Sequence, residues 1–460
     1  MKKRGLSLIF VLLAGCATSL PTVDGDKLPA EPPAQFKEKW TLAAPAEAQP
    51  RGEWWKAFND PVLDALMERA NQGNASVRVA AARLAQARAV ARITDAYRSL
   101  QVGVGASASR QQGLVNGGSG GPRNLFTAGA DLSYEVDLFG RLSHNTEAAR
   151  RDAQAEEGLL QSTRLLVQAS VAQTYLALRA LDAERALVQS TLVAYRETLS
   201  LTERRWRAGD VAELDVARSS TEVSATESEV LALDRRRAEL ENALAVLLGE
   251  NPSQFSLQDA EWSTALPVIP AGVPSTVLTR RPDVAAAQQS MLAAQSRVGV
   301  AKAAWFPNIA LTGFGGYASS DMDDLFQWSS RAWLIGALFS LPVLDGGRRK
   351  AGVENTSAQL DGAVARYREQ VLVAFKDVED QLAALRLLSE QAEAQARAVS
   401  SASRTTSLSG TRYRAGYVSQ LELLDAQRSE LRNRRQALQV RSDRYQSTVA
   451  LVRALGGSWD

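Results

Sequence analysis

Two stretches of the chain alternate between apolar and polar side chains, which is the pattern of β-strands. In residues 100–138 the clearest run of alternate apolar positions comprises Ala128, Ala130, Leu132, Tyr134, Val136 and Leu138. In residues 307–343 the corresponding run comprises Trp333, Ile335, Ala337, Phe339, Leu341 and Val343. Each strand would have about ten residues, the length that a tilted membrane strand needs. The pattern predicts two β-hairpins with one apolar face each, and a soluble hairpin over a core would give the same alternation.

A long helical pattern follows each hairpin, and a shorter one returns after it. The outgoing patterns occupy residues 147–207 and 350–414, and the returning patterns occupy 211–248 and 418–455. Neither outgoing pattern contains proline, and about 60 residues of helix would extend roughly 90 Å. Apolar residues in the second one follow a near-heptad spacing typical of coiled coils, at Leu360, Val364, Tyr367, Val371, Ala374, Val378 and Leu385. Gly209 and Gly416 lie where the patterns reverse, and Gly tolerates the positive φ of a helix end. We expect them at the tips of two helical hairpins.

The two halves of the chain share one register with an offset of 207 residues. The offset relates Gly209 to Gly416, Gly140-Arg141 to Gly347-Arg348, and Leu248-Gly249 to Leu455-Gly456. Such a register predicts a tandem duplication. The predicted division is a signal peptide (1–15), an N-terminal tether and wrap (16–60), a first repeat (61–250), a linker (251–274) and a second repeat (275–457). The two helical tips fall at about 207–215 and 414–425.

The predicted strands are too few to close a barrel within one chain. Even small barrels need about eight strands, and open strand edges are not tolerated in lipid. No stretch after the N-terminus offers 18 uninterrupted apolar residues, so no transmembrane helix is predicted. Several chains would therefore have to share one barrel. Two copies would give eight strands and a filled interior, whereas three would give twelve and leave room for a lumen.

The N-terminus has the features of a bacterial export signal. A basic start, Lys2-Lys3-Arg4, precedes a short apolar stretch that ends in Leu13-Ala14-Gly15-Cys16. This ending resembles the lipobox, in which cleavage leaves a lipid-carrying cysteine as the first residue. Cys16 is the only cysteine, so it cannot form an internal disulfide. We expect a lipid anchor on Cys16, the alternative being an ordinary secretory signal with an incidental cysteine. Ala17 instead of Asp after the cysteine favours the outer membrane.

Charge and composition point away from nucleic-acid binding and catalysis. The 53 basic and 51 acidic residues nearly balance, which implies no general attraction to nucleic acid. The single histidine, His144, is interpreted as a surface residue after a strand. No cysteine cluster, phosphate-binding loop or nucleophile elbow is found. We expect no enzymatic activity and no cofactor other than the covalent lipid.

Taken together, these features resemble the TolC-type outer-membrane factors, in the lipoprotein (OprM- or NodT-like) branch that serves RND multidrug efflux pumps. The resemblance covers essentially all of the mature chain. It is carried by the lipobox, Trp54-Trp55 with Phe58 and Asp60-Pro61, Asp137-Leu138-Phe139-Gly140-Arg141, Pro342-Val343-Leu344-Asp345-Gly346-Gly347-Arg348, and the two Arg-Ala-Gly tips. The resemblance implies an α+β membrane protein: a homotrimer with a twelve-stranded β-barrel in outer-membrane lipid, a long periplasmic α-helical barrel and a mixed belt around its middle. It also implies that the helical tips dock to a periplasmic adaptor protein above an inner-membrane RND pump.

The resemblance also indicates a periplasmic gate near the second tip. Leu421, Asp425 and Arg428 have helical spacings of four and three, which place them on one face. In the family the matching positions build a constriction, and three copies of an acidic residue would favour cations. In the first repeat the matched positions are Leu214, Arg218 and Thr221, and Asp215 and Glu422 match further acidic positions. Asp425 is expected to be held by Arg428 or Arg218. Val418 occupies a position where the enteric prototype has Arg, and the alternative is that these are solvated coiled-coil charges.

The function implied is a passive outer-membrane exit duct for small molecules. Within transport, the alternative is a duct for type I protein secretion. Outside transport, the alternative is a structural coiled-coil lipoprotein without a pore, which would not need the paired hairpins.

Lipidation of Cys16 can be tested by the intact mass of the mature chain. We expect the mass of a chain that begins at Cys16 and carries thioether-linked and amide-linked lipid. A mature chain that starts elsewhere, with an unmodified N-terminus, would contradict the expectation.

Overall fold

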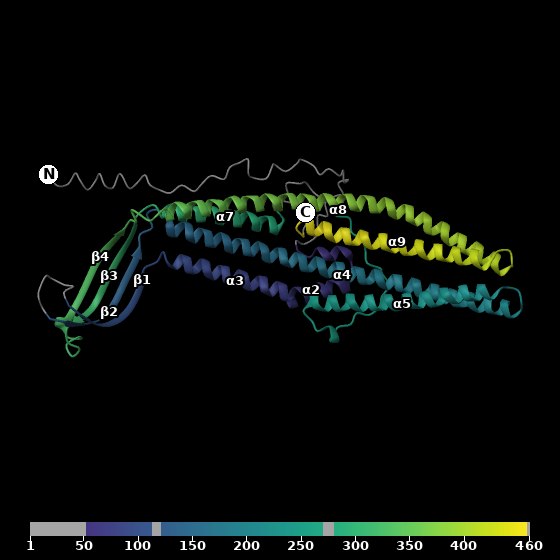
Figure 1. Ribbon diagram of the computed structural model, residues 1–460, viewed down its shortest axis with the longest axis horizontal. Coiled ribbons are helices and arrows are strands. Elements are labelled where there is room, and N and C mark those ends of the chain that lie inside the picture. Colours follow the sequence, from purple (N-terminus) through teal and green to yellow (C-terminus); the bar gives the residue numbers. More distant parts are fainter. Residues whose placement is uncertain (1–51, 113–120, 270–279, 458–460) are drawn as a thin grey trace. The chain divides into compact units, whose positions relative to one another are not determined.

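The computed structural model describes residues 52–112, 121–269 and 280–457 (Figure 1). The predicted signal peptide, Cys16, most of the tether and the end of the linker lie outside these ranges. The described residues form two compact units, which we treat separately. The first holds those of Ala82–Gly158 and Ala285–Gln370, and the second holds those of Glu31–Ala81, Leu159–Val284 and Val371–Asp460.

The helices and strands follow the duplicated order of the sequence. The strands are β1 (Gln101–Gln111), β2 (Arg123–Glu135), β3 (Asn308–Ser319) and β4 (Arg331–Ser340). The α-helices are α2 (Pro61–Gly73), α3 (Ala75–Ala96), α4 (Arg141–Arg207), α5 (Glu213–Leu248), α7 (Pro282–Ala303), α8 (Arg348–Arg414) and α9 (Gln420–Ala454). Short 3-10 turns are η2 (Trp54–Phe58), η3 (Pro252–Gln254) and η4 (Trp328–Ser330). The expectation of four strands and long helices per chain is confirmed. No helix within the described ranges is long and apolar enough to cross a membrane.

The long helices begin earlier and the return strands end earlier than the periodicity indicated. Asp137 accepts hydrogen bonds from the backbone N–H groups of Leu142 (3.0 Å) and Ser143 (2.7 Å), which caps α4. Burial alone would raise the pKa of Asp137, but these bonds and that of the Ser143 hydroxyl lower it. Asp345 likewise accepts from the N–H of Arg349 (3.2 Å) at the start of α8. These caps satisfy helix N-termini directly after the strands, so alternation beyond Glu135 and Ser340 does not continue as strand.

In the first unit, the strands form one antiparallel sheet in the order β1-β2-β3-β4 (Figure 1). The central pair, β2 with β3, joins the first repeat to the second. Gly129 lies opposite Gly316 in this pair, and a Cβ on Gly316 would collide with the backbone of the neighbouring strand. Among the described residues, β1 and β4 pair on one side only. The sheet of a single chain therefore has two open edges.

The register gathers apolar side chains on one face of this sheet. Leu132 lies opposite both Val102 and Gly313, and Gly313 lies opposite Ile335. Because side chains alternate along a strand, the same face also carries Val104, Tyr134, Ile309, Leu311, Trp333 and Phe339. The other face carries Ser107, Thr127, Asp131, Ser133, Glu135 and Thr312, together with Phe314, Leu334 and Leu338. The predicted alternation is thus clear on the apolar face, while the polar face is mixed.

The second unit preserves the duplication at the ends of its helices. The Asn74 amide donates to the Leu247 carbonyl (2.7 Å), and the Arg281 guanidinium donates to the Ala454 carbonyl (3.2 Å). Both members of the second contact lie 207 residues after those of the first. Gly249 and Gly456 have positive φ values of 76° and 89° at these junctions, where little space is left for a Cβ. The same helix-end contact is therefore made once in each repeat.

The two copies of this junction differ in charge. Arg281 is 7% exposed and pairs with Asp283 (2.7 Å) and Asp377 (3.1 Å). Burial alone would lower the pKa of Arg281, but the hydrogen bonds and charges of the two carboxylates raise it. In the first repeat, Asn74 fills the corresponding position, so that contact is uncharged. The second junction therefore depends on the ion pairs that the buried Arg281 guanidinium forms with Asp283 and Asp377.

Replacing Arg281 with Met should destabilise the protein, because Asp283 and Asp377 would lose the buried cation that neutralises their charge. We expect the free energy of unfolding to fall by about 3 kcal/mol, measured by thermal unfolding followed by circular dichroism. Arg297→Met is the control, since Arg297 forms a half-exposed pair with Asp152, and it should cost less than about 1 kcal/mol. Equal losses in the two variants would contradict this role of Arg281.

Candidate functional site at the helical tips

The two helical tips, which join α4 to α5 and α8 to α9 (Figure 1), both lie in the second unit and have the same backbone geometry. Gly209 and Gly416 adopt φ values of 82° and 79°. The N–H of Asp210 donates to the Arg205 carbonyl (2.8 Å), and at the other tip the N–H of Tyr417 donates to the Arg412 carbonyl (2.9 Å). These bonds, each closing a six-residue turn, are the usual termination of a helix by a left-handed glycine. The sequence repeat therefore corresponds to one turn built twice.

The tips differ in how the returning helices begin. The Ser419 hydroxyl accepts a hydrogen bond from the N–H of Glu422 (3.3 Å) and so caps α9. Ala212 occupies the matching position before α5 and offers no side-chain acceptor. Glu213 and Asp215 place negative charge in the first turn of α5, where a carboxylate is favourable. Asp215 and Glu422 thus both lie in the first turns of returning helices.

The residues predicted for the gate lie on α9 and α5. Arg428 lies 3.6 Å from Asp425, and Arg218 lies 3.6 Å from Asp215, as oxygen–nitrogen distances. The Asp425 side chain is 63% exposed, and Leu421 is 44% exposed. The structure therefore brings Asp425 beside Arg428, one of its two expected partners, whereas Arg218 pairs with Asp215.

Arg428 makes a shorter contact that the sequence did not indicate. Its guanidinium donates to the carboxylate of Glu222 on α5, which lies 206 positions earlier in the chain. The Glu222 side chain is only 15% exposed. The hydrogen bond with Glu222 and the charges of Glu222 and Asp425 raise the pKa of Arg428, against the opposing effect of burial. Because Glu222 corresponds to Ser429 in the second repeat, the internal comparison gave no signal for it.

A small apolar cluster lies next to the Arg428–Glu222 pair. Tyr195 of α4, which is 2% exposed, packs in it with Leu192, Val223 and Leu424. Burial, and then the nearby charge of Glu222, raises the pKa of Tyr195 to about 12. The cluster therefore holds α9 against both α4 and α5 and excludes water from one side of the ion pair.

Three further polar contacts join the hairpins closer to the tips. The Gln420 amide donates to the Ser219 hydroxyl (2.7 Å), and the two residues are 3% and 2% exposed. The hydroxyls of Thr202 and Tyr413 lie 3.2 Å apart. Arg205 donates to the Tyr413 carbonyl (3.3 Å), and its guanidinium carbon lies 5.1 Å from the centre of that ring. Together with Arg428–Glu222, these contacts link the first hairpin to the second through four residue pairs.

Farther along α9, Arg435 continues the series. It donates to Glu184 of α4 (2.8 Å) and also to Glu229 of α5. Gln420, Arg428 and Arg435 are separated by eight and seven positions, close to two helical turns. One stripe of α9 therefore carries the polar contacts with the α4–α5 hairpin.

The described part of the predicted linker, up to Ile269, lies against the same helices. Arg237 of α5 donates to the Leu257 carbonyl (2.6 Å) and pairs with Asp259 (2.7 Å) and with the buried Asp182 (2.8 Å). Tyr445 of α9 donates to the Thr264 carbonyl (2.5 Å). The linker thus contacts both the first hairpin and α9, and it reinforces their association away from the tips.

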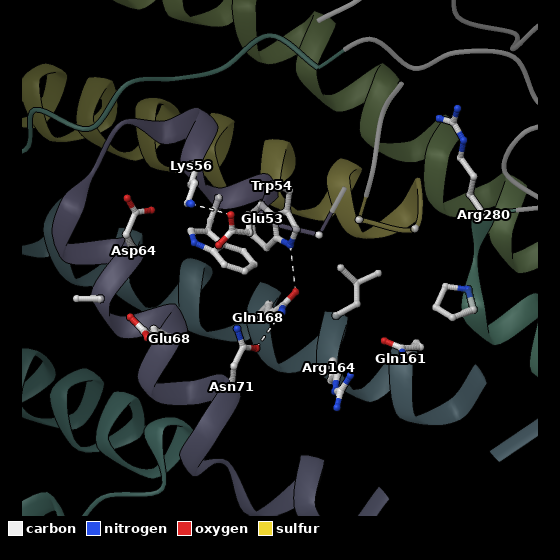
Figure 2. Close-up of a pocket in the computed structure, with 17 residues that line it drawn as sticks. Glu53, Trp54, Lys56, Asp64, Glu68, Asn71, Gln161, Arg164, Gln168 and Arg280 are labelled. Carbon is white, nitrogen blue, oxygen red and sulfur yellow. Dashed lines mark hydrogen bonds and ion pairs between the residues drawn. The ribbon is translucent and has the colours of Figure 1, made fainter. Parts of the chain in front are cut away.

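A cavity lies elsewhere in the second unit (Figure 2). It has a volume of about 1020 Å³ and is lined by side chains of both charges. Trp54 donates to Gln168 (3.3 Å), which donates to Asn71 (2.9 Å). Gly52, Arg280 and Gly457, each next to a segment outside the described ranges, also line it. The described residues contain no group of three potential metal ligands.

The raised pKa of Tyr195 predicts a stability change at alkaline pH. The folded state keeps the phenol protonated up to about pH 12, whereas the unfolded chain loses the proton near pH 10. Stability from this group is therefore complete below pH 10 and is lost as pH rises toward 12. Tyr195→Phe should weaken this loss, measured by thermal unfolding across that pH range. An unchanged pH dependence in the variant would contradict the prediction.

Comparison with known proteins places the whole chain in one family. A model of the family described as outer membrane efflux protein matches residues 66–250 and 273–457, two segments that are also offset by 207 residues. The solvent efflux pump outer membrane protein SrpC of Pseudomonas putida is 32% identical over 473 residues, covering 100% of this chain and 99% of that protein. The cation efflux system protein CusC of Escherichia coli O6:H1 is 31% identical over 453 residues, covering 98% and 97%. The solved structure of the outer-membrane channel OprN superposes with a TM-score of 0.88 at 30% identity and covers 96% of this chain and 100% of that one. The chain therefore belongs to the outer membrane efflux protein family.

Proposed function

We propose that three copies of this chain form the exit duct of a tripartite efflux pump. The sheet of one chain carries the proposal, because it has an apolar face and, within the part of the chain that the structure describes, leaves β1 and β4 unpaired on their outer sides. Unpaired backbone N–H and C=O groups are not tolerated in lipid. If β4 of each copy pairs with β1 of the next, three copies close a sheet of twelve strands around a lumen.

In this proposal the helical tips face the periplasm and dock to an adaptor protein, which connects the duct to an inner-membrane RND pump. Both tips present a left-handed glycine and adjacent exposed side chains, including Trp206 and Tyr417 at 44% and 78% exposure. Such exposed aromatic residues are typical of protein interfaces. Energy for transport comes from the pump, so the duct conducts passively.

The proposed substrates are small solutes rather than folded proteins. The relatives named above serve pumps described as exporting solvents or cations, and another is described as part of an antibiotic efflux pump. These cargoes differ widely in charge and polarity. A duct that serves such different pumps would select weakly among its solutes.

We propose that the polar contacts between α9 and α5 restrain the periplasmic end of the duct. Widening this end would separate the two hairpins, so Arg428–Glu222 and Gln420–Ser219 would have to break. Three symmetry-related copies would also bring the Asp425 carboxylates toward one axis, where Arg428 offsets their repulsion. Each partly solvated ion pair contributes about 1 kcal/mol, and three copies act together.

The proposal predicts a wider and less cation-selective duct when Asp425 and Arg428 are both replaced with Ala. Single-channel conductance in planar bilayers should rise, and cation selectivity should fall because the acidic ring is lost. Native mass spectrometry in detergent should still show trimers.

The matched control replaces Arg235 and Glu239 with Ala, because this exposed pair lies within α5 alone. It should leave conductance unchanged. Normal trimers with unaltered conductance and selectivity in the Asp425/Arg428 variant would show that the restraint lies elsewhere. A stable monomer with full conductance would overturn the shared duct itself.

A further inference from the structure

The loop between β3 and β4, residues 320–330, is folded in a way that presents aromatic side chains outward. Leu325 is 3% exposed, and it is the buried residue of this otherwise exposed loop. The Asp324 carboxylate accepts from the Gln327 amide (2.6 Å), and the Asp324 carbonyl accepts from the Ser330 hydroxyl (2.7 Å). These contacts hold the segment between Asp324 and Ser330 in one conformation.

Two aromatic residues in this segment are largely exposed. Phe326 is 69% exposed and makes an edge contact with Tyr317, with ring centres 5.7 Å apart. Trp328 is 74% exposed, and the Arg331 guanidinium carbon lies 3.1 Å from its ring centre. The Arg331 Nε also donates to the Trp328 carbonyl (2.8 Å). The loop therefore keeps an aromatic pair and a cation together at its surface.

This group lies at the end of the apolar face of the sheet. The register places Tyr317 opposite Arg331 on that face, one alternate position from Trp333. Apart from the aromatic residues Tyr134, Tyr317 and Trp333, the charged or hydrogen-bonding residues of the same face lie at the loop ends of the strands: Arg110, Asn124, Ser319 and Arg331. Phe326 and Trp328 thus follow the point where the face changes from apolar to polar.

Tryptophan and other aromatic residues concentrate at the boundary between lipid tails and headgroups. Arginine beside them suits lipid phosphate, since its planar guanidinium forms paired hydrogen bonds with phosphate oxygens. We propose that residues 324–331 form a lipid anchor in which Phe326 and Trp328 enter the headgroup boundary of the outer leaflet and Arg331 pairs with lipid phosphate. The proposal rests on the membrane orientation in the proposed function.

The anchor residues and the strand residues reach lipid for different reasons. Lipid contact along a strand follows from alternation alone, whereas Phe326 and Trp328 belong to a connecting segment that ordinarily faces water. Their exposure depends on the buried Leu325 and on the hydrogen bonds of Asp324. The second repeat therefore supplies a fixed membrane contact beyond its strands.

A fluorescent label on a single introduced cysteine tests the position of this segment. Phe326→Cys, labelled with an environment-sensitive dye, is compared in phosphatidylcholine–phosphatidylglycerol vesicles with two references. Ile335→Cys lies on the apolar face, where Ile335 is 81% exposed, and Asp323→Cys marks the exposed acidic part of the loop. The unsubstituted chain, taken through the same labelling, gives the background from Cys16.

We expect the label at 326 to lose most iodide quenching relative to the label at 323, and to be quenched more strongly by headgroup nitroxide lipid than the label at 335. Adding Arg331→Gln should partly restore iodide quenching at 326. Equal iodide quenching at 326 and 323 would overturn the anchor. Protection from iodide without quenching by nitroxide lipid would also overturn it, because protein would then cover the site. Iodide access at 335 would instead contradict the proposed membrane orientation.

Discussion

Backbone hydrogen bonding between β2 and β3 is the interaction on which the sheet depends. It is the only strand pairing between the two repeats within the described residues, and it converts two separate hairpins into one surface. An isolated two-stranded hairpin is marginally stable in water, so neither repeat would supply a stable sheet by itself. The opposed Gly129 and Gly316 are suited to this pairing because a side chain at Gly316 would obstruct the approach of the strands.

Duplication supplied equivalent backbone positions, and later divergence gave them different chemistry. The junctions at Asn74 and Arg281 reach corresponding carbonyl groups, yet one is neutral and the other contains a buried ion pair. The tips likewise share their glycine turn, but only α9 has a serine cap. This arrangement suits a duct. Equivalent helices can form a wall with a repeating structure, and unlike side chains allow specific contacts between neighbouring helices.

Some contacts between the two helical hairpins resist their separation, whereas others can be replaced by contacts with solvent. The buried Gln420–Ser219 hydrogen bond and the Tyr195 cluster exclude water, so breaking them exposes apolar and polar surface together. Arg428 is 45% exposed, and solvent can replace its partners at modest cost. Strong packing with replaceable ionic contacts is appropriate for the restraint that we propose at the periplasmic end, which would have to hold and also open.

The sequence by itself determined the elements that arise from local patterns. Two-residue alternation predicted the strands, the long stretches without proline predicted the helices, and glycine at 209 and 416 predicted the tips. The offset of 207 residues revealed the duplication without any other protein for comparison. These inferences succeed because each depends on residues close in sequence, or on one segment resembling another.

Tertiary structure alone decided which distant residues meet. Glu222, rather than Asp425 alone, became the principal partner of Arg428 because α9 packs against α5 across 206 positions. The ends of the strands were set by the caps at Asp137 and Asp345, whose carboxylates turn to satisfy helical N–H groups. The exposed position of Trp328 beside Arg331 likewise follows from the folded loop. In each case the outcome depends on three-dimensional distance and competition among partners, which periodicity along the chain does not contain.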